Sequence, residues 1–322
     1  MTILLWLLVL PAALWAVVRL GGWERGIVVQ LFAFTPYVAA WSLLPLVLAL
    51  IARRWAVAGV ALAVAAALIG CVLPRALPGH DRGPATGVEL RVMSANLLAG
   101  GADPATVVAL VRDNDVAALA LQEFTGKAEA ALTAAGLDEL LPYSSIGPET
   151  DPFGTTGSAF YSRFPIAGAG VRRNGGGFQQ AYGTITPPGA VPVLIESAHP
   201  SAPYAVSALG DWRSDLEAQP GADPARVPRI LLGDFNSTLD HEPLRTLISR
   251  GYRDAAAAAG QGLVPTWGPY HGRPIPPVTI DHVLVDRRIG VGDVSVHRVP
   301  QSDHRSVIAS LRIPAFASSR RP

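Results

Sequence analysis

Long apolar runs occupy the first quarter of the chain. No charged side chain occurs from Met1 to Val18, from Gly26 to Ala52 or from Trp55 to Pro74. Each run is close to the ~20 residues that a helix needs to cross the hydrocarbon core of a bilayer. The pattern therefore predicts a three-helix transmembrane anchor in residues 1–74. A buried helix of a soluble protein would need a partner core on all its sides, and a signal peptide would explain only the first run.

Arginines flank these apolar runs in pairs. The six that precede residue 85 are Arg19 and Arg25, Arg53 and Arg54, and Arg75 and Arg82. Cytoplasmic loops of membrane proteins carry an excess of Lys and Arg. Because the pairs fall on both sides of any arrangement of three spans, the charges leave the membrane orientation open.

The pattern changes after residues 75–87, a segment rich in proline and glycine that predicts a linker. Short apolar runs follow, most of them continuous rather than alternating, as is typical of strands buried on both faces in a layered fold. These runs are ELRVMSAN, VAALALQE, GSAFYSR, VPVLIESAH, RILLGDFN, TIDHVLV and SVIASLRI. They predict one α/β domain at residues 88–314, followed by a tail at residues 315–322.

Segments with a helical pattern lie between the strand-like runs. Pro104–Arg112 has proline at its start, Lys127–Ala135 is rich in alanine, and Asp240–Arg250 is expected to begin at an Asp cap and to stop at Gly251. No internal repeat is visible. The alternation of strand and helix patterns is typical of a layered α/β fold.

Charge and cysteine content narrow the function classes. From Ala85 onward the chain has 20 Lys and Arg against 23 Asp and Glu, a net charge of −3, although the whole chain has +1. Non-specific nucleic-acid binding depends on a surplus of Lys and Arg facing phosphates. The composition disfavours that class, while a local basic groove stays possible. The single cysteine, Cys71, lies in the third apolar run, which excludes a disulfide framework and a thiolate metal site.

Polar and ionisable side chains stand where the strand-like runs end. They are Asn96, Glu123, His199, Asp234, Asn236, Asp281, Asp303 and His304. The ends of neighbouring strands form a common rim in layered α/β proteins, and ligands bind there. Carboxylate and amide oxygens suit a hard cation such as Mg²⁺ or Mn²⁺, and two histidines complete a set for acid–base chemistry.

Taken one at a time, these residues have simpler explanations. Asp234 and Asn236 form an Asp-x-Asn pattern that is often only a turn, because both side chains hydrogen-bond to nearby backbone. Asn96 alone would be a capping or loop residue, and a lone His199 before Pro200 would be structural. Glu123 is harder to dismiss, because a carboxylate at the end of an apolar run needs a partner. The joint occurrence of these residues at strand ends favours a site.

The order N…QE…H…GDFN…DH…SDH resembles the endonuclease/exonuclease/phosphatase superfamily, which includes DNase I and its relatives. The resemblance extends over Leu90–Ile313 and includes two further landmarks, YSRFPI at Tyr161–Ile166 and the pair Thr266 and Trp267. It implies a four-layer α-β-β-α sandwich with two mixed sheets in the middle. It also implies an enzyme that hydrolyses phosphoesters.

The resemblance further implies a role for each residue at the rim. Asn96, Glu123 and Asp303 correspond to the metal site for Mg²⁺ or Mn²⁺, with Glu123 as a direct ligand and Asp303 as the second carboxylate.

The remaining five correspond to catalytic positions. Asp234 and Asn236 would orient the attacking water and contact the scissile phosphate. His304, oriented by Asp281, would stabilise the phosphoryl oxygens, and His199 would contact the phosphate. With both histidines as donors, activity is expected to depend on their protonation near neutral pH.

The apolar runs favour one substrate class over others that this superfamily hosts, because fold alone does not decide substrate. A rim held close to a bilayer favours a lipid-linked phosphate or pyrophosphate. The layout resembles membrane-anchored bacterial members associated with glycopeptide resistance, whose catalytic domain faces outward from the cell membrane. That resemblance implies a multi-pass membrane protein with an extracytoplasmic domain.

Two other functions are considered. A membrane-tethered nuclease acting on extracellular DNA or RNA could use Arg172, Arg173 and Asn174 of Val171–Gln180, a segment that otherwise predicts a glycine-rich hairpin. A non-catalytic membrane sensor or scaffold is disfavoured, because none of the eight rim positions is lost.

Overall fold

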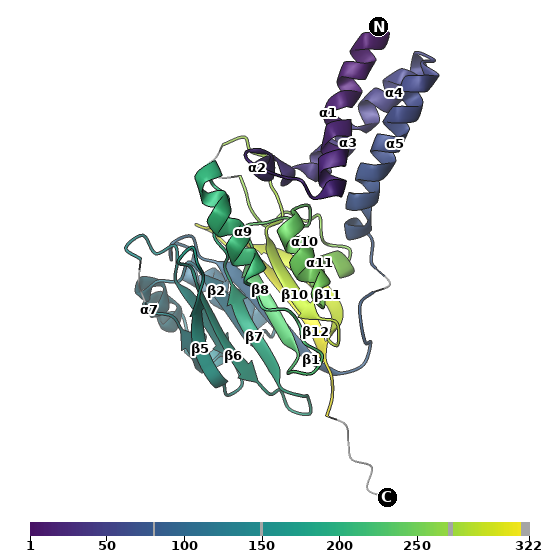
Figure 1. Ribbon diagram of the computed structural model, residues 1–322. Helices are drawn as coiled ribbons and strands as arrows, with labels where there is room; N and C mark the ends of the chain where they lie inside the picture. The colour runs from purple at the N-terminus through teal and green to yellow at the C-terminus, as the bar shows by residue number, and fades with distance from the viewer. Residues whose placement is uncertain (80, 149–150, 270–272, 317–322) are drawn as a thin grey trace, which may run out of the picture.

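Two six-stranded mixed sheets form the centre of the molecule in a computed structural model that describes residues 1–79, 81–148, 151–269 and 273–316 (Figure 1). The strand order is β11-β12-β1-β2-β4-β3 in the first sheet and β5-β6-β7-β8-β10-β9 in the second. The pairs β1/β2 and β7/β8 are parallel and the other pairs are antiparallel. The predicted α/β fold with two mixed sheets is confirmed.

All seven predicted strands are present, as β1 (Val88–Asn96), β2 (Ala118–Gln122), β4 (Ser158–Ser162), β7 (Val193–Ala198), β8 (Arg229–Asp234), β10 (Asp281–Asp286) and β12 (Arg305–Ile313). The sequence analysis missed five others: β3 (Tyr143–Ile146), β5 (Ala167–Arg173), β6 (Gln179–Ile185), β9 (Tyr252–Asp254) and β11 (Gly290–Arg298). Of these, β3, β5, β9 and β11 lie at sheet edges. An edge strand has a neighbour on one side only, and the exposed residues in β3, β5 and β11 weaken the apolar pattern.

Strand periodicity explains why the predicted runs are apolar throughout. Successive side chains of a strand point to opposite faces of its sheet. In β8, Ile230 and Leu232 pack in the core between the two sheets, while Leu231 packs beneath the helices of the outer face. In β1, Val92 faces the inner core and Met93 faces the opposite helical layer. Both faces of these strands are buried, so apolar residues do not alternate with polar ones along them.

Helices cover the outer faces of both sheets. The first sheet is covered by α6 (Pro104–Asp113), α7 (Gly126–Ala134) and α8 (Leu137–Leu140), and the second by α9 (Leu209–Glu217) and α10 (Glu242–Ser249), with η2 (Val206–Ala208) before α9 and α11 (Ala255–Ala258) after β9. The side chains of Asp103 and Thr125 cap α6 and α7 by accepting from backbone N–H groups. The layers are therefore those of an α-β-β-α sandwich.

The expected start of α10 is wrong. Asp240 does not cap this helix, whose N-cap is His241, although Gly251 follows its end as expected. The Asp240 carboxylate binds Arg19 and Arg75 instead, at positions far away in the sequence. A local capping pattern and a long-range ion pair look the same in the sequence.

The first 76 residues form a helical extension above one end of the sandwich (Figure 1). Its helices are α1 (Thr2–Gly21), α2 (Val28–Phe32), α3 (Thr35–Trp41), α4 (Leu43–Ile51) and α5 (Trp55–Val72), followed by η1 (Leu73–Ala76). By length and composition, Thr2–Gly21 and Trp55–Ala76 could cross a membrane. In the most apolar 18 residues of each, 28% and 33% of the residues are buried. Neither is thus enclosed like the core helix of a soluble protein.

Three continuous transmembrane helices are not confirmed, because the middle run is broken. Its last two helices form a shorter apolar stretch, Thr35–Ile51, that returns along the bundle between α1 and α5. Pro36 lies in the first turn of α3, where proline is tolerated. Pro45 lies near the start of α4, and its missing N–H is consistent with the break at Ser42.

The segment predicted as a linker runs along the sandwich instead of spanning open space. Arg75 binds Asp240, and the Gly79 N–H donates to the Ala258 carbonyl. Asp81 pairs with the guanidinium groups of Arg253 and Arg287. The domain boundaries themselves stay a prediction, and the predicted tail lies mostly outside the described residues.

Candidate active site

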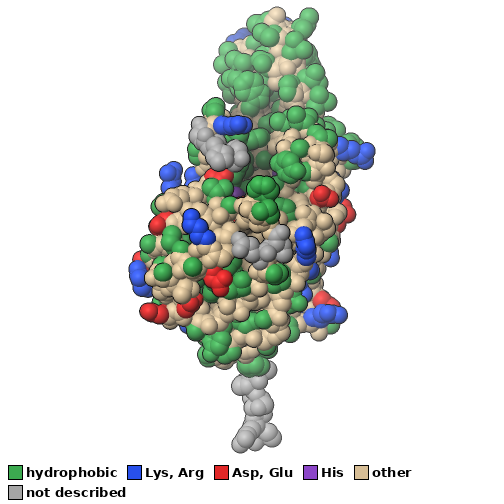
Figure 2. Space-filling view, turned by 90° about the vertical axis from the view of Figure 1, so that its left-hand side faces the viewer, with side chains coloured by type: hydrophobic (Ala, Val, Ile, Leu, Met, Phe, Trp, Pro, Cys, Tyr) green, Lys and Arg blue, Asp and Glu red, His purple; other side chains and the backbone are tan. Residues whose placement is uncertain are grey.

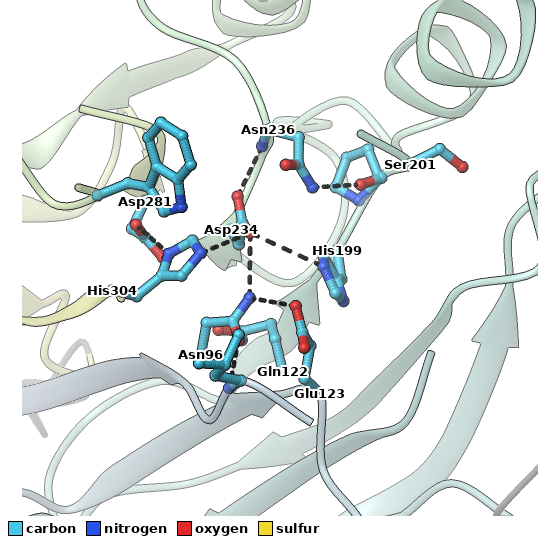
Figure 3. A network of polar contacts seen from close by, with 12 residues as sticks. Asn96, Gln122, Glu123, His199, Ser201, Asp234, Asn236, Asp281 and His304 are labelled. Carbon is cyan, nitrogen blue, oxygen red and sulfur yellow. Dashed lines mark hydrogen bonds and ion pairs between the residues drawn. The ribbon is translucent and has the colours of Figure 1, made fainter. Parts of the chain in front are cut away.

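Strand parity brings the predicted rim residues into one place. In β8 the even-numbered side chains point toward the first sheet. Asp234 therefore lies on the same inner face as Ile230 and Leu232. The same parity puts Asn96 on the inner face of β1, in line with Val92. Because β1 and β8 end at the same edge of the sandwich, their last polar residues meet between the sheets (Figure 3).

Asn96 joins two carboxylates at the centre of this site. Its Nδ2 donates to Glu123 Oε1 and to Asp234 Oδ2, at 3.1 Å in both cases. Its Oδ1 accepts from the Leu98 N–H at 3.0 Å, and Glu123 Oε2 accepts from the Ala99 N–H at 2.7 Å. In this arrangement Asn96 orients the carboxylates rather than presenting a free oxygen, and its predicted place among the metal ligands stays a prediction.

His304 lies between two buried carboxylates. Its Nδ1 is 2.9 Å from Asp281 Oδ2, and its Nε2 is 3.6 Å from Asp234 Oδ2. Burial by itself would lower the pKa of His304, but the charges of Asp281 and Asp234 raise it to about 10. At neutral pH this side chain is therefore an imidazolium, held in place by Asp281 as its predicted carboxylate partner.

His199 has the opposite electrostatic setting. Its Nε2 is 3.8 Å from Asp234 Oδ2, and its ring packs edge-on against Phe178 with centroids 4.7 Å apart. Burial, and then the positive charge of His304, lower the pKa of His199 to about 3. Its Nδ1 is buried and has no hydrogen-bond partner among the described residues. A neutral imidazole here still has one N–H to donate.

Asp234 is the group that titrates near neutral pH. Burial raises its pKa to about 7, against the opposing effect of the His304 charge. The expectation that both histidines titrate near neutrality is therefore wrong for this arrangement. The carboxylate between them changes its charge there instead.

Backbone conformation turns two further residues toward the site. Glu123 and Asn236 have φ angles of 53° and 48°, a left-handed conformation that is uncommon for residues other than glycine. A regular extended backbone after Gln122 would point Glu123 to the outer, helical face of its sheet. Such strained residues cluster at functional sites, where the surrounding structure holds them in place.

Asn236 is fixed from two directions. Its backbone N–H donates to Asp234 Oδ1 at 2.8 Å, and its Nδ2 donates to the Pro200 carbonyl at 3.0 Å. Glycine is required just before this turn, because a Cβ on Gly233 would lie 2.0 Å from the Ala198 carbonyl oxygen. The Gly-Asp-x-Asn pattern thus combines close packing of β7 and β8 with a hydrogen-bonded turn.

The residues present fit a divalent cation. Asp303 Oδ1 is buried without a hydrogen-bond partner in the described part of the chain, while its Oδ2 accepts from Trp267 Nε1 at 3.1 Å. Burial, and far less strongly the charge of Asp303, raise the pKa of Glu123. Buried carboxylates without a compensating charge are unfavourable. Glu123 and Asp303 could hold such an ion through oxygen atoms, the donors that Mg²⁺ and Mn²⁺ prefer.

A second acidic cluster is explained without an ion. Ligand atoms of Asp234, Asp281 and His304 all lie within 4.8 Å of one another. The imidazolium of His304 already supplies the positive charge between these two carboxylates. The cluster therefore serves as an ion-paired triad beside the candidate cation site.

Trp267 and Thr266 support the acidic residues, a function that the sequence analysis did not assign to them. Thr266 Oγ1 accepts from the backbone N–H of Asp281, and Trp267 contacts Asp303 as described. Backbone bridges also connect Trp267 to both Val278 and His304. The only signal in the sequence was the Thr-Trp landmark shared with the resembling superfamily.

The segment Val171–Gln180 is the predicted glycine-rich hairpin. Arg172 binds Glu196, Gln219 and Asn174. Asn174 is buried, and its Nδ2 donates to the His199 carbonyl. Arg172 and Asn174 are thus engaged in contacts within the domain, whereas Arg173 is exposed and donates from Nε to the Gly177 carbonyl.

The chain matches the model of the endonuclease/exonuclease/phosphatase family over residues 93–304. Similar solved structures include an endonuclease/exonuclease/phosphatase from Beutenbergia cavernae (20% identity, TM-score 0.56, 70% of this chain and 72% of that one). A humanized D. rerio TDP2 is also similar, with 12% identity and a TM-score of 0.56 over 70% of this chain and 99% of that one. Sphingomyelinase C from Streptomyces griseocarneus has 16% identity and a TM-score of 0.50 over 69% of this chain and 99% of that one. At these identities the likeness shows the fold alone. No curated protein matches the chain.

Proposed function

The chain belongs to the endonuclease/exonuclease/phosphatase family, and we propose that it is a membrane-anchored, divalent-metal-dependent phosphoesterase that hydrolyses a lipid-linked phosphate or pyrophosphate at the cell envelope. One observation carries the lipid assignment. The loop that leaves His199 contacts both the site, through Pro200 and Asn236, and the helical extension, through a hydrogen bond from Gln30 Nε2 to the Pro203 carbonyl at 2.8 Å. The apolar helices and the site thus lie at the same end of the sandwich.

The chain's own residues supply the acid–base chemistry. Asp234, once deprotonated, accepts a proton from the attacking water, and the water oxygen forms a bond to phosphorus. The bond between phosphorus and the leaving oxygen breaks, and that oxygen takes up a proton from solvent. The His304 imidazolium, the His199 N–H and Asn236 donate hydrogen bonds where negative charge develops on the phosphoryl oxygens.

Glu123 and Asp303 are the residues proposed to hold the divalent cation. When bound, such an ion polarises a phosphoryl oxygen and stabilises the leaving group. Asn96 donates to both carboxylates and so orients Glu123 as the proposed metal ligand and Asp234 as the proposed base. Asp281 is a positioning residue that maintains the charge and the orientation of His304.

We also propose that the helices cross the bilayer three times with the sandwich outside the cell. At the end near the sandwich, Arg19 and Arg75 are bound to Asp240 and Arg25 is exposed, whereas at the far end beside the N-terminus both Arg53 and Arg54 are exposed. The positive-inside rule then favours a cytoplasmic location for the far end.

A phosphate-release assay tests the proposed function. Detergent-purified protein would be given a long-chain prenyl pyrophosphate, plasmid DNA or RNA, each with Mg²⁺ or Mn²⁺. We expect phosphate release from the lipid, abolished by Asp234→Asn and retained by Asp293→Asn, a substitution of an exposed carboxylate away from the site. Nicked plasmid or cleaved RNA with intact lipid would identify a membrane-tethered nuclease instead. Biological activity that persists in Asp234→Asn would favour a non-catalytic sensor or scaffold.

A further inference from the structure

A short helix lies between the site and the membrane-length helices. Residues 22–34 connect the end of α1 to the start of α3 and contain α2. The buried side of α2 carries Val29, which packs against the outer face of the second sheet, and Phe32, which stacks on Trp15 with ring centroids 4.9 Å apart. His241 Nε2 lies 2.8 Å from the Val29 carbonyl. The helix is therefore fixed to both the sandwich and α1.

The opposite side of α2 is apolar but uncovered. Ile27 and Leu31 are 62% and 43% exposed. Residues three and four apart share a face of a helix, so Ile27, Gln30 and Leu31 point the same way. Gln30 Nε2 donates to the Pro203 carbonyl, which joins this face to the loop that carries the exposed Tyr204. We call the exposed side chains of Ile27, Leu31, Tyr204 and Val206 the apolar ledge.

The loop that carries Tyr204 and Val206 of the apolar ledge begins at the site. Pro200, which accepts the Asn236 hydrogen bond, and His199 stand only a few residues before Tyr204 in the same loop. No charged residue occurs from Pro200 to Gly210 or from Gly26 to Ala52, the two segments that form the ledge. These two segments contribute no charged side chain to the surface between the site and the helical extension, and the exposed Arg25 immediately precedes the second segment. Figure 2 shows a hollow below the extension, bordered mainly by hydrophobic side chains with a few charged ones among them.

Exposed apolar side chains beside a polar site mark a surface for an apolar partner. The ledge lies at the level where α1 ends and α3 begins, so if these helices cross a bilayer it lies at the membrane–water interface. Trp23, 64% exposed in the same connection, is a residue type enriched at that interface. The continuity with the apolar helices indicates that the partner comes from the bilayer.

Resting on the proposed function, we propose that the apolar ledge holds the hydrocarbon chain of the lipid phosphate next to the headgroup while the phosphate occupies the site. The chain would lie along Ile27, Leu31 and Tyr204, and the headgroup would pass Pro200 toward Asn236 and His199. The ledge selects a substrate that is presented at a membrane surface. A water-soluble phosphoester, which has no such chain, gains nothing from it.

The test compares two substrates on the same full-length protein in vesicles of phosphatidylethanolamine and phosphatidylglycerol. One substrate is a long-chain prenyl pyrophosphate in the vesicle, and the other is p-nitrophenyl phosphate in solution. The variants are Ile27→Ser with Leu31→Ser, and Tyr204→Ser. The matched control is Val227→Ser, which changes an apolar side chain of 42% exposure at the opposite end of β8.

We expect kcat/KM for the vesicle lipid to fall roughly tenfold or more in the ledge variants, mainly through KM, with hydrolysis of p-nitrophenyl phosphate unchanged. The control should match wild type on both substrates. Equal losses of activity on both substrates, or no loss on the lipid, would contradict the proposed binding of the hydrocarbon chain by the ledge. The proposed phosphoesterase activity would still stand. Wild-type protein that hydrolyses neither substrate would overturn the proposed function and the ledge together. The soluble substrate also reports folding of each variant.

Discussion

Removing the Asp240 carboxylate should destabilise the junction between the helical extension and the sandwich. Asp240 is fully buried and accepts from Arg19 Nε at 2.8 Å and from Arg75 Nη1 and Nη2 at 2.8 and 2.6 Å. The two arginine side chains are only 9% exposed. Burial by itself would raise the pKa of Asp240, but Arg75 and Arg19 hold it below its usual value, so the group stays ionised.

The magnitude follows from what Asp240→Ala leaves behind. Two buried guanidinium groups lose their shared counter-charge, and breaking a buried ion pair in this way costs about 3–5 kcal/mol. At about 2–4 °C per kcal/mol for a domain of this size, Tm should fall by roughly 6–20 °C. The measurement is thermal unfolding in detergent, with Asp293→Ala as the control at an exposed aspartate.

A triple variant separates this reasoning from simple loss of packing. Adding Arg19→Leu and Arg75→Leu to Asp240→Ala removes the stranded charges, and replacing a whole buried ionic cluster with apolar side chains is often neutral. The triple variant should therefore recover much of the lost Tm. Equal unfolding temperatures for Asp240→Ala and Asp293→Ala, or a triple variant less stable than the single one, would show that the buried charges do not set the stability of this junction.

The stability that Asp240 contributes should also decrease in acid. Because the pKa of Asp240 is lowered on folding, its contribution is complete above the ordinary aspartate pKa and is lost as pH falls through the folded-state value. Tm of wild type should fall in acid more steeply than Tm of the triple variant. Scans between neutral and acid pH would measure this difference.

Three further outcomes are expected from the site. The kcat/KM profile should be bell-shaped, falling about tenfold per pH unit below a pKa near 7, where Asp234 becomes protonated, and again above about 10, where His304 loses its proton; a profile flat between pH 5 and 9 would contradict these assignments. Asp281→Asn should move both limbs to lower pH, because the charge of Asp281 raises the pKa of both groups; the pH–rate profile of the variant measures this. Trp267→Phe should raise the Mn²⁺ concentration for half-maximal phosphate release by roughly 10–100-fold, because Trp267 orients the Asp303 carboxylate; an unchanged titration would exclude that role.

Burial on both faces is the reason that the central strands could be predicted. The runs around Val92, Leu231 and Leu284 are apolar at successive positions because each sheet has a core on either side. Strand β5 has no such signal, since its sequence contains two glycines and most of its side chains are partly or fully exposed. Its pairing with β6 comes from the hairpin at Asn174, a feature of turn geometry rather than of hydrophobic pattern.

The gathering of the site residues could be predicted for a similar reason. The end of one strand shares an edge with the end of a parallel neighbour and with the start of an antiparallel one, as Asp234 does with Asp281, and parity decides which face these residues take. Parity fails for Glu123, whose left-handed backbone conformation turns it back toward Asn96. The charges of the histidines could not be predicted either. The opposite pKa shifts of His199 and His304 depend on burial and on which ring faces Asp281, and neither is visible along the chain.

The turn after β8 connects the site to the helical extension, in addition to the loop that follows His199. Asn236, at the site, and Asp240, which binds Arg19 and Arg75, are four residues apart in the turn after β8. The buried ion pairs fix this turn relative to α1, so the site cannot change its distance from the helices without breaking them. If those helices are in a bilayer, a substrate must therefore reach a site held at constant height above the membrane. Such a geometry suits a headgroup attached to a membrane lipid, and the Asp240 variants remove the ion pairs of this connection without removing any residue of the site.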